Sequence, residues 1–157
     1  MKLLSRLQFF RKFFGKSGGR QPELDARDET LLEAAQNLEK NLRFEQALQC
    51  YDEIIQRHPH IARTHLLRGN LLSTMGDHDG ALAAYRNALS RNSDYAAAHF
   101  NIGDIFYQLR QYDQALACFR LALEKDPRLV NAEVAMACIY EDTGDFSQAI
   151  AYYRKVL

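Results

Sequence analysis

Tryptophan is absent from the 157-residue sequence, and cysteine and proline each occur only three times. Cys50, Cys118 and Cys138 are odd in number and form no C-x-x-C pair, which favours a reducing compartment over a secreted disulfide scaffold. Long apolar runs are missing as well, because no stretch approaches the ~18 residues that a membrane span requires. The start of the chain lacks the uninterrupted apolar core of a secretory signal, since basic residues interrupt it. The sequence therefore predicts a protein that is neither secreted nor membrane-spanning.

Net charge is also absent, with 20 basic and 20 acidic residues, but the charges are unevenly distributed. Residues 1–22 contain six basic residues and no acidic one, so their formal charge is +6 and that of the remaining chain is −6. The six are Lys2, Arg6, Arg11, Lys12, Lys16 and Arg20. With 47% hydrophobic and 25% charged residues, the chain has the composition of one globular unit. We expect a basic tail in front of one mildly acidic domain.

An internal repeat with a period of about 34 residues runs through that domain. Four alanines recur once in every period: Ala47, Ala81, Ala115 and Ala149. An aromatic residue follows each alanine by four positions: Tyr51, Tyr85, Phe119 and Tyr153. A further apolar residue follows each aromatic by three positions: Ile54, Ala88, Ala122 and Val156. Apolar residues at i, i+4 and i+7 predict one amphipathic helix per repeat.

A second helix is predicted before each of these helices. Gly69 and Gly103 recur one period apart within it, and glycine in a helix costs about 1 kcal/mol relative to alanine. Their recurrence therefore predicts a close approach of the paired helices, with Ala35 and Ala137 at the same site in the outer repeats. Prolines end the first and third repeats, where they stop one helix before the next begins.

These features resemble the tetratricopeptide repeat family, whose pattern is an early aromatic, a pair of small residues, A-x3-F and a closing proline. The resemblance covers 28–157. The family's tryptophan is replaced by His65 and His99 in the middle repeats, and the glycine of the turn inside each repeat is replaced by Leu42 and Arg110. Because one hairpin cannot bury its apolar face, several must stack.

The resemblance implies an all-α fold: an α-solenoid, a right-handed superhelix of stacked helix-turn-helix hairpins. The expected organisation is a basic amphipathic segment with a Gly/Ser-rich end at 1–22, a short linker at 23–27 and a repeat domain at 28–157. Its four repeats are 28–61, 62–95, 96–129 and the incomplete 130–157. The implied function is a non-catalytic scaffold or adaptor for protein partners.

The first helices of such repeats line the concave side of the solenoid, which is the usual binding surface of the family. There the sequence places an apolar row formed by Leu32, Leu66, Phe100 and Val134. Polar residues flank this row: Gln36, Asn70, Asn101, Asp104 and Tyr107. We expect a groove with an apolar floor and hydrogen-bonding walls, suited to a peptide or helix of a partner. The cationic clamp that some members use for chaperone tails is missing, since its sites carry Leu32, Leu66, Ala97, Asn131 and Ala135.

The basic tail is a second candidate interaction site. On a helical wheel one face is apolar and carries flanking cations, and its candidate docking residues are Leu3, Leu7, Phe10, Arg11, Lys12 and Phe14. A basic amphipathic helix of this kind can lie on an anionic membrane, dock on a partner protein or act as a mitochondrial-type targeting peptide. Nucleic acid is the least favoured ligand. The expected location is the cytoplasm, with peripheral attachment to the inner face of a membrane as one form, and mitochondria as the alternative.

The last helix carries Ile150, Tyr153 and Val156 without a following helix in the sequence to cover them. An alternative function is therefore a structural subunit that assembles into homo-oligomers through this end. Catalysis, a cofactor and a metal site are not predicted. His58, His60 and His65 are better explained by a turn and by packing, and no nucleophile, base and orienting acid can be assembled from spacing.

Overall fold

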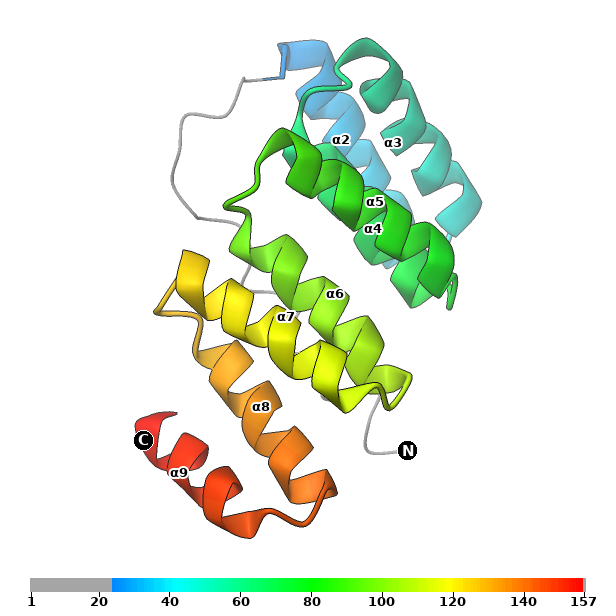
Figure 1. Cartoon of the computed structure of the whole chain (residues 1–157). Coiled ribbons are helices and arrows are strands. Elements are labelled where there is room, and N and C mark those ends of the chain that lie inside the picture. The colour runs from blue at the N-terminus through cyan, green and yellow to red at the C-terminus, as the bar shows by residue number, and fades with distance from the viewer. Residues whose placement is uncertain (1–23, 157) are drawn as a thin grey trace.

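The computed structural model describes residues 24–156, which fold into eight α-helices without a strand. The helices are α2 (Ala26–Lys40), α3 (Phe44–Arg57), α4 (Ala62–Thr74), α5 (His78–Arg91), α6 (Ala96–Gln108), α7 (Tyr112–Lys125), α8 (Val130–Asp142) and α9 (Phe146–Val156). They pair as the hairpins α2–α3, α4–α5, α6–α7 and α8–α9, and Figure 1 shows these hairpins stacked in chain order. The predicted all-α repeat fold is confirmed.

The stacking joins each hairpin to the next through two kinds of contact. The second helix of a hairpin packs on the first helix of the next, as α3 does on α4, α5 on α6 and α7 on α8. The first helices α4, α6 and α8 also contact one another in order. We call α2, α4, α6 and α8 the A helices and the other four the B helices. The A helices thus form one continuous layer of the solenoid.

Alanine and glycine allow the two helices of each hairpin to cross closely. Ala81 and Ala115 are completely buried at these crossings. A Cβ atom added at Gly69 would lie 2.5 Å from Cε1 of Tyr85, and one at Gly103 would lie 2.7 Å from Cε1 of Phe119. These distances are shorter than van der Waals contact, so the close approach expected from the recurring glycines is present.

The turn inside each hairpin has the same left-handed backbone in all four repeats. The residues with positive φ are Leu42 (60°), Gly76 (84°), Arg110 (58°) and Gly144 (82°), each one period after the last. Glycine adopts this conformation without steric cost, whereas leucine and arginine do not. The repeat therefore imposes its turn geometry even where the sequence lacks glycine.

Histidine takes over part of the role of the missing tryptophan. Nε2 of His65 lies 2.9 Å from the carbonyl oxygen of Pro59, and Nε2 of His99 lies 3.2 Å from that of Ser93. Pro59 and Ser93 end the preceding repeats, so each ring ties the start of an A helix to the turn before it. This pairing accounts for the polar residue in an otherwise apolar position.

The first helix begins earlier than the predicted repeat boundary at residue 28. It starts at Ala26, inside the predicted linker 23–27, because Asp25 caps it by accepting a hydrogen bond from the backbone N–H of Asp28 at 2.9 Å. Asp28 itself is fully buried and forms ion pairs with Arg57, at 2.5 Å, and His58, at 2.7 Å. The later repeats have Ala62, Ala96 and Val130 at this site, so the cluster is particular to the first repeat.

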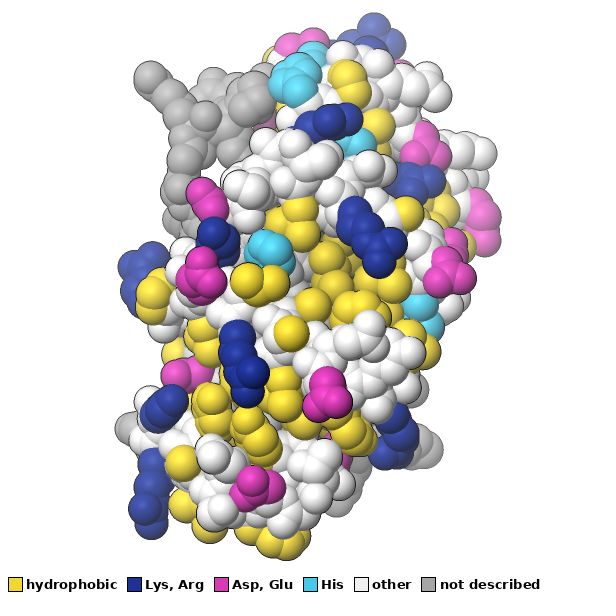
Figure 2. Space-filling view, in the orientation of Figure 1, with side chains coloured by type: hydrophobic (Ala, Val, Ile, Leu, Met, Phe, Trp, Pro, Cys, Tyr) yellow, Lys and Arg dark blue, Asp and Glu magenta, His cyan; other side chains and the backbone are white. Residues whose placement is uncertain are grey.

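The two ends of the described solenoid differ in polarity. Asn37 in α2 is exposed, and its equivalents in the later A helices are the buried Leu71, Ile105 and Ile139. At the other end, Phe146 and Ile150 of α9 are 64% and 51% exposed. Figure 2 shows apolar side chains gathered towards this α9 end. The α2 face is thus a polar cap, whereas the α9 face is apolar.

Candidate protein-binding face

Hydrogen bonds between neighbouring A helices identify one face of the A-helix layer. Nδ2 of Asn101 in α6 donates to Oδ1 of Asn70 in α4 at 2.7 Å. The hydroxyl of Tyr107 in α6 donates to Oδ2 of Asp142 in α8 at 2.8 Å. We call the surface that carries these residues and their equivalents one period away the A-helix face. Three of the predicted polar site residues, Asn70, Asn101 and Tyr107, thus lie in one ladder across α4, α6 and α8.

The amide of Asn70 is the best-held group of this ladder. Its Oδ1 accepts a second hydrogen bond, from the hydroxyl of Tyr85 at 2.9 Å, in addition to the bond from Asn101. Tyr85 is buried in the B helix of the same hairpin. Because the B helix fixes the orientation of Asn70, the amide group presented by the A helix is preorganised for a partner.

The equivalent of Asn70 in the third repeat is an acid, Asp104. Phe119 stands where Tyr85 would donate, so the hydrogen bond that Asp104 receives comes instead from Nε2 of Gln108, at 2.9 Å. Burial raises the pKa of Asp104, and this effect is opposed by that hydrogen bond and by the nearby His78. A half-buried carboxylate without its usual hydroxyl donor marks the centre of the face.

Tyrosine hydroxyls contact the acids of α8. Tyr107 donates to Asp142, and Tyr153 donates to Oε2 of Glu141 at 2.9 Å. Burial is the main cause that raises the pKa of both tyrosines, and their hydrogen-bonded neighbours raise it further. Both therefore remain neutral donors at physiological pH, and the carboxylates keep their negative charge.

Glu141 and Asp142 were missed by the sequence interpretation. Their signal is positional, because they stand one period after Tyr107 and Gln108. Acids elsewhere in the described chain have cationic partners, such as Asp52 with Arg68 at 2.6 Å and Asp94 with Lys125 at 3.1 Å. Within residues 24–156, Asp104, Glu141 and Asp142 have no ion pair of this kind.

The predicted apolar row is mostly buried. Leu32 and Leu66 are each 2% exposed, Phe100 is 6% exposed, and each belongs to the apolar cluster of its own repeat. The ring of Phe100 packs 5.3 Å from that of Phe119 between centroids. The structure gives these three side chains a packing role, and their contact with a partner stays a prediction. Val134 and Gln36 are half-buried on the same layer.

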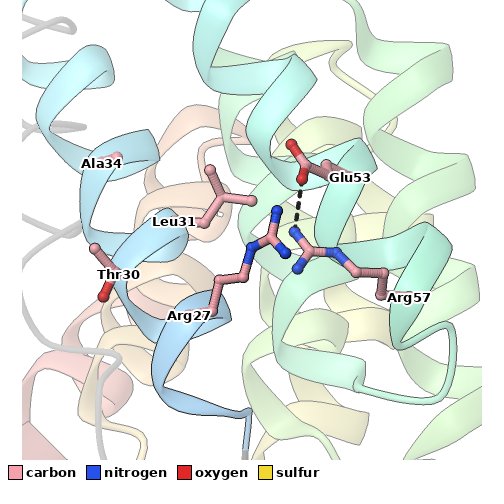
Figure 3. Close-up of a pocket in the computed structure, with 6 residues that line it drawn as sticks. All are labelled: Arg27, Thr30, Leu31, Ala34, Glu53 and Arg57. Atoms are coloured by element: carbon pink, nitrogen blue, oxygen red, sulfur yellow. Dashed lines mark hydrogen bonds and ion pairs between the residues drawn. The ribbon is translucent and has the colours of Figure 1, made fainter.

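A pocket of about 480 Å³ lies at the capped end, between α2 and α3, and is lined by Arg27, Thr30, Leu31, Ala34, Glu53 and Arg57. In Figure 3 the guanidinium groups of Arg27 and Arg57 lie next to each other. Arg57 is neutralised by Glu53, at 2.8 Å, and by Asp28. Two like charges, one of them already paired, do not build a site for a single ligand.

Asp25, Asp28 and His58 bring one potential ligand atom each to within 4.8 Å of one another. The arrangement could geometrically hold a cation, and His58 is one of the histidines discounted in the sequence. Arg57 already places Nη1 2.5 Å from Oδ1 of Asp28, and a divalent ion would be repelled by this guanidinium. The cluster is better explained as a buried ion-pair network that joins α2 to the end of α3.

The predicted docking residues Leu3, Leu7, Phe10, Arg11, Lys12 and Phe14 lie outside the described residues. Among the helices of residues 24–156, none has the length and apolar character that a membrane span requires. The three cysteines are unbonded, and burial raises the pKa of the Cys50 and Cys118 thiols, which fits packing better than nucleophilic reactivity.

Family models described as tetratricopeptide repeat match residues 32–72, 66–129 and 134–157. The chain belongs to the tetratricopeptide repeat family. Tetratricopeptide repeat proteins generally bind protein partners and are generally non-catalytic. The predicted family and its general role as a protein-interaction scaffold are confirmed by these matches.

Solved structures share the fold at low sequence identity. MamA is 19% identical with a TM-score of 0.73, over 82% of this chain and 75% of MamA. MamA 41-end from Desulfovibrio magneticus RS-1 is 16% identical with a TM-score of 0.71, over 82% of this chain and 73% of its own. PilW, described as a widely conserved type IV pilus biogenesis factor, is 21% identical with a TM-score of 0.74, over 85% of this chain and 62% of PilW. No curated protein matches the chain significantly.

Proposed function

We propose that this protein is a non-catalytic adaptor that binds a peptide or helix of a partner protein across the A-helix face. The observation that carries the proposal is the hydrogen-bonded ladder of Asn70, Asn101 and Tyr107, which aligns polar groups over three successive A helices. Side chains already ordered by one another lose little conformational entropy when a partner binds. The face is therefore suited to recognition rather than to chemistry.

The polar groups of the face match the needs of a peptide backbone or a polar helix surface. An asparagine side chain offers both a carbonyl acceptor and an amide donor, and a serine or glutamine adds similar groups at the flanks. Gln36 and Ser73 extend this polar character along the layer. An assembly role such as the one named for PilW fits a scaffold that holds another protein's segment.

Affinity purification of the tagged full-length protein with mass spectrometry would identify the partner, and Asn101→Arg tests the face. The arginine removes the bond to Asn70 and adds bulk at the centre of the ladder, so we expect recovery of the partner to fall at least about tenfold. The matched control is Gln114→Arg, because Gln114 is exposed on the B helix α7. Equal recovery with both variants would count against binding at the A-helix face.

Self-assembly through α9 is a second candidate function, favoured by the exposure of Phe146 and Ile150. In α5 the residue equivalent to Ile150 is Leu82, which is only 9% exposed because the next hairpin covers it. A second copy could supply that cover. Light scattering of Phe146→Ser with Ile150→Ser tests it: an oligomer that dissociates supports this function, and a parent that is monomeric at high concentration removes it.

Residues 1–22 are proposed to attach the adaptor to an anionic membrane surface or to a larger assembly. Their +6 charge and amphipathic pattern are what such an attachment requires. Under this proposal the protein works on the cytoplasmic side of a membrane. Flotation with anionic vesicles, compared with neutral vesicles, is the test, and equal binding to both would remove the electrostatic anchor.

A further inference from the structure

We propose that, when no partner is bound, the A-helix face is occupied by the basic segment of the same chain, residues 1–22, in an autoinhibitory contact. The inference rests on the A-helix face being the binding face of the proposed function. It adds the identity of a competing occupant and the chemistry that holds it, which is cationic side chains against the unpaired acids of α6 and α8.

The first argument is the imbalance of charge on the face. Asp104, Glu141 and Asp142 receive hydrogen bonds from Gln108, Tyr153 and Tyr107, all of which are neutral donors. A neutral donor stabilises a carboxylate without cancelling its charge. Two adjacent acids of α8 and one acid of α6 therefore leave a negative surface that attracts a cationic ligand.

Acids away from this face are treated differently by the fold. Asp52 and Asp94 are matched by Arg68 and Lys125 on neighbouring helices. The unmatched acids thus occur together on one face, where a ligand can supply the missing cations. The clustering is what distinguishes them from the solvated charges found on any protein surface.

The second argument is that residues 1–22 carry the complement. Arg11 and Lys12 stand between Phe10 and Phe14, so cationic and aromatic groups alternate along this stretch of the sequence. The A-helix face offers half-buried Val134 and Ala135 on α8, the same helix that carries the acids. A basic amphipathic helix on an acidic, partly apolar face is a common mode of peptide recognition.

The third argument is reach. Ten residues separate Lys16 from Ala26, where α2 begins, and an extended chain of that length spans about 33 Å. The acids of α8 lie three A helices away from α2, which corresponds to about 30 Å at the usual separation of packed helices. The glycines and serine of residues 15–19 make this connection adaptable. The contact can therefore form within one chain.

Charge also decides between this face and the exposed apolar surface of α9. The last turn of α9 carries Arg154 and Lys155, which would repel a basic segment. Phe146 and Ile150 supply apolar contact there but no unpaired acid. The basic segment is thus better matched to the A-helix face than to the end of the solenoid.

Photo-crosslinking in the full-length protein tests the contact. A benzoylphenylalanine replaces Phe10, the sample is irradiated at low concentration, and the linked peptides are identified by mass spectrometry. We expect links within one monomer to residues 101–108 and 131–142. Links mainly to α9 or to the B helices, links only between two chains, or no link at all would each overturn the proposal.

Charge reversal sharpens the result. Glu141→Lys with Asp142→Lys should lower the yield of links about tenfold. The matched control is Asp113→Lys with Glu124→Lys, which makes the same charge change at two exposed sites of α7 and should leave the yield within about twofold. Equal losses in both double variants would overturn the assignment, and circular dichroism establishes that each variant is folded.

Exchange of the charges provides the direct demonstration. Adding Arg11→Glu and Lys12→Glu to the Glu141→Lys, Asp142→Lys variant should restore most of the lost yield. Failure of this rescue would overturn direct pairing. The proposed function is tested separately by partner recovery with Asn101→Arg, so a partner that ignores Asn101 overturns that function while leaving the crosslink map informative about the segment.

Discussion

Replacing Leu42 by glycine is expected to stabilise the protein. Leu42 occupies the left-handed turn with φ of 60°, and a residue with a Cβ atom pays about 1–2 kcal/mol in that conformation. Glycine removes this strain but loses about 0.5–1 kcal/mol more entropy on folding. Leu42 is 74% exposed, so little packing is lost. The expected net gain in the free energy of unfolding is about 0.5–1 kcal/mol.

The opposite change at an equivalent position provides the control. Gly76 has φ of 84°, and an added Cβ would meet no atom within 4 Å. Gly76→Ala therefore isolates the backbone cost from any steric clash, and it should destabilise by about 0.5–1 kcal/mol. The two substitutions test the same conformation in opposite directions.

Thermal unfolding of the full-length variants, followed by circular dichroism, measures both effects. For a chain of this size, a change of about 0.5–1 kcal/mol corresponds to a shift of roughly 1–4 °C in Tm. We expect Leu42→Gly to raise Tm and Gly76→Ala to lower it. If Leu42→Gly lowers the Tm while Gly76→Ala leaves it unchanged, the turn does not carry the strain inferred from its dihedral angles.

Two further substitutions test the core and the face. Ala115→Phe inserts a ring at a fully buried helix crossing beside Phe119 and should cost about 1–3 kcal/mol in urea denaturation; an unchanged midpoint would show that the crossing is not tightly packed. Burial raises the folded-state pKa of Asp104, so the folded protein holds this proton more tightly and loses stability as pH rises above about 4. Asp104→Asn, which can still accept from Gln108, should therefore unfold at a higher temperature than the parent at pH 7, and this difference should disappear below about pH 4. A difference independent of pH would contradict that cause.

The register of the fold could be predicted from the sequence because the constraint is repeated. One glycine in a helix is weak information, but Gly69 and Gly103 face Tyr85 and Phe119 one period apart, and the shared spacing requires the same crossing twice. The substitutions at the turns were also visible, since Leu42 stands where the repeat expects glycine. Periodicity turned weak local preferences into a firm assignment.

Features that occur once were beyond the same reasoning. The buried cluster of Asp28, Arg57 and His58 depends on residues far apart in the sequence that meet only in the folded first hairpin. The extent of burial of Leu66 and Phe100 depends on how far the neighbouring helices cover them, which spacing does not define. Glu141 and Asp142 could have been found by reading along the period, but their lack of cationic partners within the described residues is known only from the three-dimensional arrangement.

The difference between the two end faces gives the described solenoid a direction. Asn37 and the exposed first helix oppose the addition of another hairpin in front of α2, because their polar groups would be buried without partners. Phe146 and Ile150 favour addition behind α9. Engineered lengthening should therefore succeed by appending repeats after α9 and fail in front of α2, so that the array behaves as a polymer with one terminated end and one growing end.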